Sequence, residues 1–189
     1  MTDIIWASII SIIFLSLFVI AEFLRKKGAK AETTRKFVHF GGAFVTIFFP
    51  FILTSHWTVL ALAIGFASIM FITKKIGWLQ SVHGVERKSD GAIYHPIAIY
   101  TCFLYSQILN QPMFYVISIL ILAISDALAA LVGKSYGANE YLVEVGTRKT
   151  IEGSVTFFLT SFLIVHLILL LSTQIGRVES VLIALLISI

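Results

Sequence analysis

One carboxylate lies inside an otherwise apolar run of this sequence. Asp126 stands in the run Ile-Leu-Ala-Ile-Ser-Asp-Ala-Leu-Ala-Ala-Leu-Val-Gly, seven residues before Gly133. On a helix that separation is about 10 Å. A charged side chain at the centre of a membrane helix costs roughly 2.5–3.5 kcal/mol on insertion scales, so such a residue is taken as functional by default. The alternative is a buried aspartate that hydrogen-bonds a neighbouring helix; we favour function.

A second polar group, Gly-Thr-Arg-Lys-Thr-Ile-Glu-Gly at 146–153, directly precedes another apolar run. Two cations, a hydroxyl and a carboxylate therefore lie where we expect a helix to begin. Free backbone N–H groups and the positive end of the helix dipole favour a phosphate at such a position. Thr150 or Ser154 could equally be a plain N-cap, with Arg148 and Lys149 anchoring the membrane interface. The nearby aspartate favours the functional interpretation.

Small residues follow Asp126 at helical spacing. Ala129, Ala130, Gly133 and Gly137 share one helix face with it. Small side chains there would let another helix backbone approach closely. They would also admit a bulky polyphosphate, and spacing alone does not separate the two interpretations.

Two more clusters stand at the entries of apolar runs. In Arg-Lys-Phe-Val-His, Arg35 and His39 lie four residues apart and share a helix face, whereas Lys36 points elsewhere. By itself this cluster is better explained as an interface anchor followed by a core histidine. In the stretch 86–96, a charge run leads into Tyr-His-Pro. A proline within an apolar segment, Pro96, suggests a broken helix end that lines a cavity.

Membrane helices must position all of these residues. Hydrophobic residues make up 58% of the 189, charged residues only 13%, and mean hydropathy is +0.97. Too little polar surface exists for a soluble globule of this size, so lipid must be the solvent for most of it. The apolar runs are 4–24, 37–53, 57–72, 92–109, 113–132, 154–171 and 178–189. We predict an all-α integral membrane protein, a single polytopic domain over 1–189, with six complete transmembrane helices and a seventh that looks truncated.

The basic residues predict the orientation of these helices. Thirteen of the 14 Lys and Arg residues fall in alternate loops: six in 25–36, four in 73–91 and three in 133–153. The intervening loops have none, and Arg177 is the exception. Cytoplasmic loops carry the excess of Lys and Arg, so we expect the N-terminus outside and an active face in the cytoplasm. Since the basic residues follow the first run, we expect a signal anchor rather than a cleavable signal peptide.

Taken together, the four clusters resemble the family of CTP-dependent lipid kinases that includes phytol kinase, dolichol kinase and the yeast-type diacylglycerol kinase. The resemblance covers about residues 20–155 and also includes Glu22. Its motifs are Arg35-Lys36-x2-His39, Gly91-x2-Tyr94-x-Pro96, Asp126-x2-Ala129-x3-Gly133-x3-Gly137 and Lys149-Thr150-x-Glu152-Gly153. The related phosphatidate cytidylyltransferases share the last two motifs. Both families use CTP, whereas the Arg-Lys-x2-His motif and the absence of the C-terminal synthase signature favour the kinases.

The resemblance implies γ-phosphoryl transfer from CTP to a membrane lipid alcohol: a polyprenol, phytol, dolichol or diacylglycerol. Asp126 would hold Mg²⁺ on the triphosphate or act as base, and Glu152 is a second candidate metal ligand. Arg148 and Lys149 would balance charge on the transferring phosphoryl group. The implied nucleotide-binding residues are Gly133, Gly137, Thr150, Gly153, Arg35, Lys36 and His39.

Two alternatives to a kinase stay open. One is a phosphatidate cytidylyltransferase, which makes a CDP-lipid from CTP. The other is a non-enzymatic transporter, but the chain shows no internal repeat and its polar residues cluster toward one side rather than the midplane. The expected partners are CTP, a membrane lipid and the bilayer, with no nucleic acid.

Overall fold

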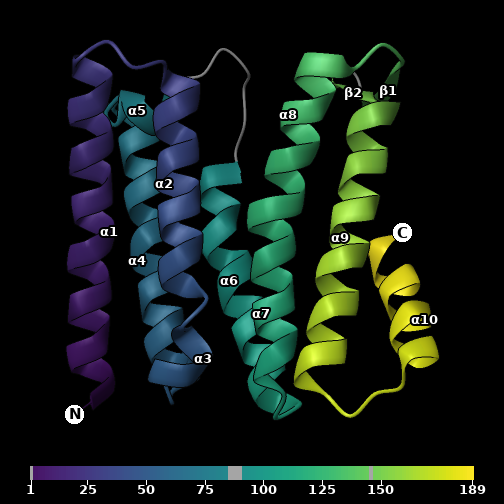
Figure 1. The fold of residues 1–189 in the computed structure, drawn as a ribbon. Coiled ribbons are helices and arrows are strands. Elements are labelled where there is room, and N and C mark those ends of the chain that lie inside the picture. The colour runs from purple at the N-terminus through teal and green to yellow at the C-terminus, as the bar shows by residue number, and fades with distance from the viewer. Residues whose placement is uncertain (1, 85–90, 145–146) are drawn as a thin grey trace. The chain divides into compact units, whose positions relative to one another are not determined.

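The computed structural model describes residues 2–84, 91–144 and 147–189 (Figure 1). Apart from one β-hairpin, its regular elements are helical. The elements before the middle of the chain are α1 (Thr2–Lys26), α2 (Ala31–Thr46), α3 (Phe49–Ile52), α4 (His56–Lys75), α5 (Gln80–His83) and α6 (Gly91–Ile108). They are followed by α7 (Pro112–Leu120), the π-helix η1 (Ile121–Ser125), α8 (Asp126–Tyr136), β1 (Glu140–Glu144), β2 (Thr147–Thr150), α9 (Ile151–Ser172) and α10 (Arg177–Ser188).

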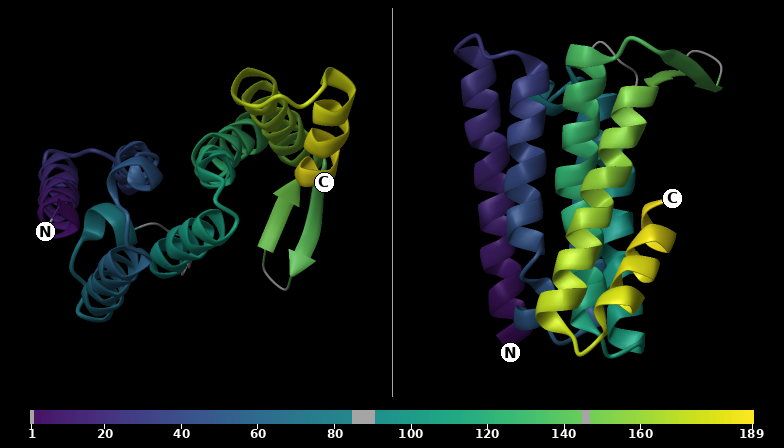
Figure 2. Two further views of the ribbon diagram at one scale, coloured as in Figure 1. Left: turned by 90° about the horizontal axis from the view of Figure 1, so that it is seen from below. Right: turned by 45° about the vertical axis from the view of Figure 1, so that its right-hand side comes forward.

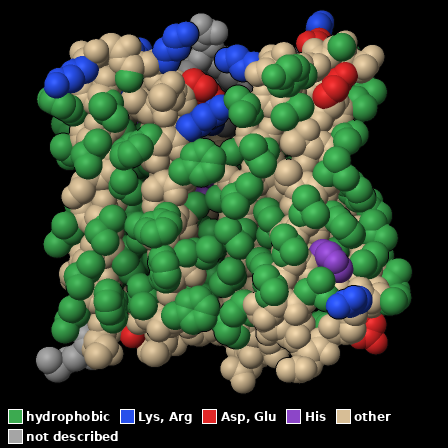
Figure 3. All heavy atoms as spheres, in the orientation of Figure 1, with side chains coloured by type: hydrophobic (Ala, Val, Ile, Leu, Met, Phe, Trp, Pro, Cys, Tyr) green, Lys and Arg blue, Asp and Glu red, His purple; other side chains and the backbone are tan. Residues whose placement is uncertain are grey.

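Four helices of the described chain are long and apolar enough to cross a membrane. They are α1, α4, the continuous helix Pro112–Tyr136 formed by α7, η1 and α8, and α9. Large hydrophobic side chains cover their outer faces, whereas basic side chains gather near helix ends (Figure 3). The predicted helical membrane architecture is confirmed at this level. Helices α2, α6 and α10 are shorter, with 16, 18 and 12 residues.

Contacts divide the chain into two compact units, residues 1–115 and 116–189, which we call the N-terminal and C-terminal units. In the N-terminal unit, α1 packs on α2 and α4 packs on α6 (Figure 2). Helix α1 also contacts α4, where the ring centroids of Phe14 and Phe66 are 4.7 Å apart. Fully buried Tyr115 donates a hydrogen bond to the carbonyl oxygen of Thr46 at 2.9 Å, which ties the start of α7 to α2.

In the C-terminal unit, α9 packs against α8 on one side and α10 on the other. Its core comprises Ile117, Val165, Leu169 and Ala184. Figure 2 shows α10 turned back along α9, where the Ser180 hydroxyl lies 3.0 Å from Nδ1 of His166. The two strands form an antiparallel hairpin in which Tyr141 pairs with Lys149. This unit holds most of the predicted site residues.

The sequence placed the start of a helix within 146–153, with Thr150 as one of two possible N-caps, and α9 begins at Ile151 with Thr150 as its N-cap. It did not predict the strand at 147–150, so Arg148 and Lys149 belong to a hairpin. The helix break suggested at Pro96 was wrong, because α6 continues through this residue. This proline stands early in the helix, so its missing N–H costs a single hydrogen bond. The predicted charge run at 86–90 lies outside the described residues.

Candidate functional site

The Asp126 carboxylate is exposed and has no hydrogen-bond or ion-pair partner among the described residues. It directly follows η1, and single π-helical turns inside α-helices occur frequently at functional sites. Ser125, the last residue of η1, is fully buried, and its hydroxyl also lacks a described partner. The structure therefore presents a charged group that no described side chain neutralises, next to an irregular turn.

Glycines let α8 and α9 approach closely, one of the two alternatives that the sequence left open. A Cβ on Gly133 would lie 2.7 Å from the Thr150 hydroxyl oxygen, and one on Gly153 would lie 3.0 Å from the carbonyl oxygen of Ala129. A Cβ on Gly137 would also collide with Thr150. These predicted nucleotide-binding residues are thus in mutual contact, and the space beside their α-carbons is filled by protein.

The N-terminus of α9 is capped by protein groups. Thr150 is the N-cap, and its hydroxyl accepts a hydrogen bond from the N–H of Gly153 at 3.2 Å. The N–H of Ile151 donates to the carbonyl oxygen of Asn139 at 3.0 Å. In return, the Glu152 carboxylate accepts from the side-chain amide of Asn139 at 2.9 Å. Capping of α9 by protein groups thus accounts for the roles of Thr150 and Glu152 at this helix start without a bound ligand.

The two cations of the hairpin differ in their contacts. The Arg148 guanidinium lies 3.0 Å from the Glu140 carboxylate on the neighbouring strand. The Lys149 ammonium has no partner among the described residues. Its cross-strand neighbour Tyr141 is fixed by a 2.6 Å hydrogen bond to the hydroxyl of Ser154 on α9. Lys149 is therefore the cation on this hairpin that is available to an added anion.

In the N-terminal unit, the structure joins the two clusters at the entries of α2 and α6. The rings of His39 and His95 have centroids 5.2 Å apart. One turn earlier on α2, Arg35 pairs with Glu32 at 2.9 Å, and its buried Nε has no described hydrogen-bond partner. Sequence reasoning missed His95, although it lies between two matched motif positions, Tyr94 and Pro96.

A hydrogen-bond network fixes the short helix α5 between α1 and α2. The N–H of buried Ser81 donates to the Glu22 carboxylate at 3.1 Å, and its carbonyl oxygen accepts from the Thr34 hydroxyl at 2.7 Å. At the end of α5, the His83 Nε2 lies 3.0 Å from the Thr73 hydroxyl. Burial, and secondarily the charge of Lys74, lower the pKa of His83 below its ordinary value.

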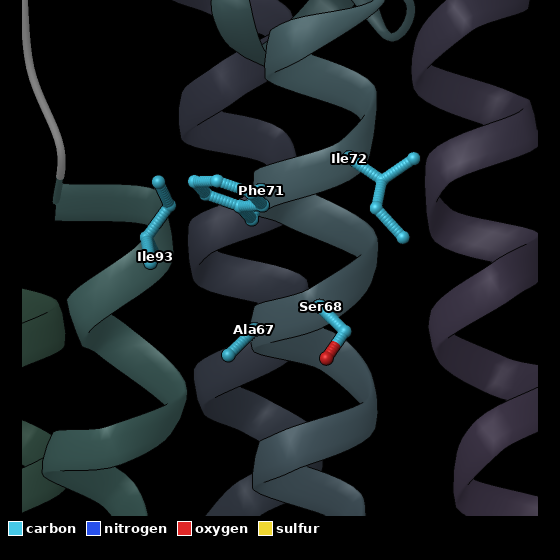
Figure 4. A pocket seen from close by; sticks show the side chains of 5 residues that line it. All are labelled: Ala67, Ser68, Phe71, Ile72 and Ile93. Carbon is cyan, nitrogen blue, oxygen red and sulfur yellow. The ribbon is translucent and has the colours of Figure 1, made fainter.

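A shallow groove runs between α4 and α6 in the same unit (Figure 4). Ala67, Phe71 and Ile72 of α4 line it together with Ile93 of α6, and Ser68 supplies its one hydroxyl. Figure 4 shows Phe71 and Ile93 directed toward one another across it. Such a lining suits hydrocarbon chains, since it offers little to a polar headgroup.

Fold and composition define a helical membrane protein, and comparison with known proteins gives its family. The chain belongs to the Cytidylyltransferase family, whose profile matches residues 2–189. It is similar to a phytol kinase of Synechocystis sp. (strain ATCC 27184 / PCC 6803 / Kazusa), with 34% identity over 145 residues, which cover 76% of this chain and 62% of that protein. The chain thus spans about three fifths of the length of this curated relative. No solved structure matches. The relationship to CTP-using lipid enzymes predicted from the motifs is confirmed.

Proposed function

We propose that this protein is a CTP-dependent lipid kinase, which transfers the γ-phosphoryl group of CTP to the hydroxyl of a membrane alcohol. The observation that carries the proposal is that Asp126 and Lys149, which lie in the same compact unit, both have side-chain charges without a partner among the described residues. Phosphoryl transfer requires little covalent chemistry from protein, but it requires positioning and neutralisation of charge. The similarity to a phytol kinase supports an alcohol as the acceptor.

Asp126 would hold Mg²⁺ on the triphosphate, or act as base toward the alcohol. Among the described residues no group of three or more His, Cys, Asp or Glu side chains could hold a metal. Magnesium usually binds through one or two carboxylates together with substrate phosphates, so Asp126 with at most one further carboxylate would suffice. When bound, Mg²⁺ would neutralise charge on the phosphates. Glu152 stays a second candidate ligand, although it would first have to release Asn139.

Lys149 would contact the phosphate oxygens where charge develops in the transition state. Arg148 would contribute less, because its guanidinium is already paired with Glu140. The backbone around Gly133, Gly137, Thr150 and Gly153 would support the nucleotide chiefly by holding α8, the hairpin and α9 together. Arg35, Lys36 and His39 of α2 stay candidate nucleotide-binding residues in the N-terminal unit, by the resemblance of their motif to that of the lipid kinases.

Isotope placement in CTP tests the reaction. Membranes containing the protein are incubated with CTP labelled at the γ- or the α-phosphate, and with a panel of polyprenol, phytol, dolichol, diacylglycerol and phosphatidate. We expect γ-label in the lipid product and release of CDP. Transfer of α-label to phosphatidate with no transfer of γ-label to any alcohol would contradict the proposal.

A phosphatidate cytidylyltransferase is the second candidate, because the matching family is named for that chemistry. In that reaction the lipid phosphate attacks the α-phosphorus of CTP and pyrophosphate leaves. Asp126 and Lys149 could serve either reaction, since both need a metal-bound triphosphate. The two labels distinguish them directly.

For the topology, we propose six to seven membrane crossings, an external N-terminus and a cytoplasmic active face. The α2 and α6 helices would supply crossings beyond the four long helices. A cysteine introduced at Asn139 in a Cys102→Ser background should react with an impermeant reagent only after the cytoplasmic side is opened. A cysteine at Gln111 should react from outside. The reverse pattern would invert the orientation.

A further inference from the structure

A pocket of about 340 Å³ lies at the basic end of the N-terminal unit. Its walls are Glu22 and Lys26 of α1, residues 77–79 of the connection between α4 and α5, and Gln80, the first residue of α5. Small-molecule sites in proteins begin at roughly this size. Trp78 on its rim is 68% exposed, and tryptophan with nearby lysines is typical of the level of the lipid headgroups.

The pocket has a rigid wall. Ser81 is fully buried and is held on both sides, by Glu22 and by Thr34. Gly77 and Leu79 both have positive φ angles, 74° and 51°. For leucine this conformation is strained, and such strain persists where surrounding contacts hold it. Here the Leu79 side chain packs against the cluster of Phe18, Met70 and Val82.

Four side chains of the pocket carry polar groups: Glu22, Lys26, Trp78 and Gln80, whose amide nitrogen already donates to the carbonyl oxygen of Gly77 at 2.8 Å. The two charged ones are an acceptor and a donor. One oxygen of the Glu22 carboxylate accepts from Ser81, and the other has no partner among the described residues. The Lys26 ammonium likewise has no described partner. Glu22 and Lys26 are one helical turn apart, so both can reach a single small group. A hydroxyl satisfies both, because it donates to the carboxylate and accepts from the ammonium.

We propose that this pocket binds the hydroxyl end of a long-chain lipid alcohol, the acceptor class of the proposed kinase. The inference rests on the proposed function for the identity of the ligand. Trp78 and Leu79 would cover the first carbons of the chain, while Glu22 and Lys26 bind the oxygen. A phosphate monoester fits less well, because Glu22 would repel it.

Photolabelling without CTP tests the site independently of turnover. The probe is a long-chain primary alcohol with a diazirine next to the hydroxyl-bearing carbon. We expect labelling of the peptide that contains residues 77–80, and competition by excess phytol. Phytyl methyl ether cannot donate a hydrogen bond to Glu22, so it should compete at least about tenfold less well.

Two variants and a matched control complete the test. Glu22→Gln keeps an oxygen for Ser81 but turns the pocket's acceptor into an amide donor, so labelling should fall about tenfold. Trp78→Ala should lower it as well. Trp57→Ala removes an equally exposed tryptophan, 68%, from the other end of α4 and should change nothing.

Three outcomes would overturn the inference: equal competition by the methyl ether, labelling insensitive to both variants, or stronger competition by phosphatidylethanolamine than by phytol. Specific labelling without γ-phosphate transfer would instead contradict the proposed function and leave the site standing. Transfer of γ-phosphate to an alcohol, with no specific labelling at 77–80, would contradict this binding site but not the proposed kinase activity.

Discussion

Two aspartates, one in each unit, show how differently a carboxylate can be held in this chain. Asp3 at the start of α1 accepts hydrogen bonds from the N–H of Ser55 at 2.8 Å and from the N–H and hydroxyl of Thr54. Asp126 at the start of α8 has no partner among the described residues. The first links α1 to the loop before α4. The second is the carboxylate for which we propose a ligand, because an unpaired charge in an apolar helix otherwise only destabilises it.

The glycines of the two units also differ, in how much space surrounds their α-carbons. Gly133 and Gly153 stand where α8, α9 and Thr150 meet at distances that leave no room for a Cβ. In the N-terminal unit, Gly65 of α4 has no atom within 4 Å of the position that its Cβ would occupy. Close packing in the C-terminal unit thus fixes the backbone that carries Asp126 and Lys149, while no described residue pairs with their charges.

The largest expected effect separates the two aspartates. Asp126→Asn keeps the side-chain size but removes the charge, so turnover should fall at least ~100-fold if a metal ligand is lost. Membrane insertion should survive, since an amide costs less than a carboxylate there. Asp3→Asn, the control, should leave turnover unchanged and lower thermal stability slightly. Kinase assays and thermal unfolding of both purified variants measure the two effects. A fully active Asp126→Asn protein would show that Asp126 has only a structural role.

A smaller effect should separate the two cations of the hairpin. Lys149→Ala should lower turnover roughly 10- to 100-fold, because an ammonium near the phosphoryl oxygens acts where charge builds up. Arg148→Ala should cost less, since its guanidinium already pairs with Glu140. Steady-state kinetics with CTP as the varied substrate measures both. Equal losses would indicate that the pair with Glu140 opens when the nucleotide binds.

The two classes of glycine should respond to alanine in opposite directions. Gly133→Ala should destabilise the protein by about 1–3 kcal/mol, because Thr150 is bonded to Gly153 and cannot move aside. Gly65→Ala should be neutral or stabilise by up to about 1 kcal/mol, as alanine is the better helix former. Thermal unfolding in detergent compares them. In the double variant Gly133→Ala/Thr150→Ala the two costs should be less than additive, since without the Thr150 hydroxyl the new methyl group no longer meets that oxygen.

The sequence predicted the long apolar helices well, because a run of nearly 20 apolar residues has few other stable solutions. It also placed Thr150 as one of two possible N-caps. The hairpin at 140–150 was missed, because its charged residues also fit the first turn of a helix and its pairing depends on Asn139 contacting α9. Spacing could not decide what the glycines of α8 contact, since that depends on a residue 17 positions away, Thr150.

The smallest predicted effect is the pH dependence of stability that comes from His83, the last residue of α5. Its pKa lies below the ordinary 6.5, mainly because burial disfavours the charged imidazolium. Above pH 6.5 the imidazole of His83 is mostly neutral in both the folded and the unfolded chain. Its titration therefore takes no stability from the fold in that range. As the pH falls below that value, the unfolded chain binds a proton more readily, and stability is lost down to the folded-state pKa.

Thermal unfolding midpoints measured between pH 7.5 and 5.5, a window of about one unit on each side of the ordinary histidine pKa, test this difference. The midpoint should fall toward the acid end, and His83→Gln should reduce that fall, since glutamine can still bond the Thr73 hydroxyl but does not titrate. The decrease should be small, because the ring is only partly buried. His56→Gln, at the opposite end of α4, is the control and should retain the full acid dependence. An unchanged slope in His83→Gln would assign the acid sensitivity to other groups and leave His83 as a packing residue of α5.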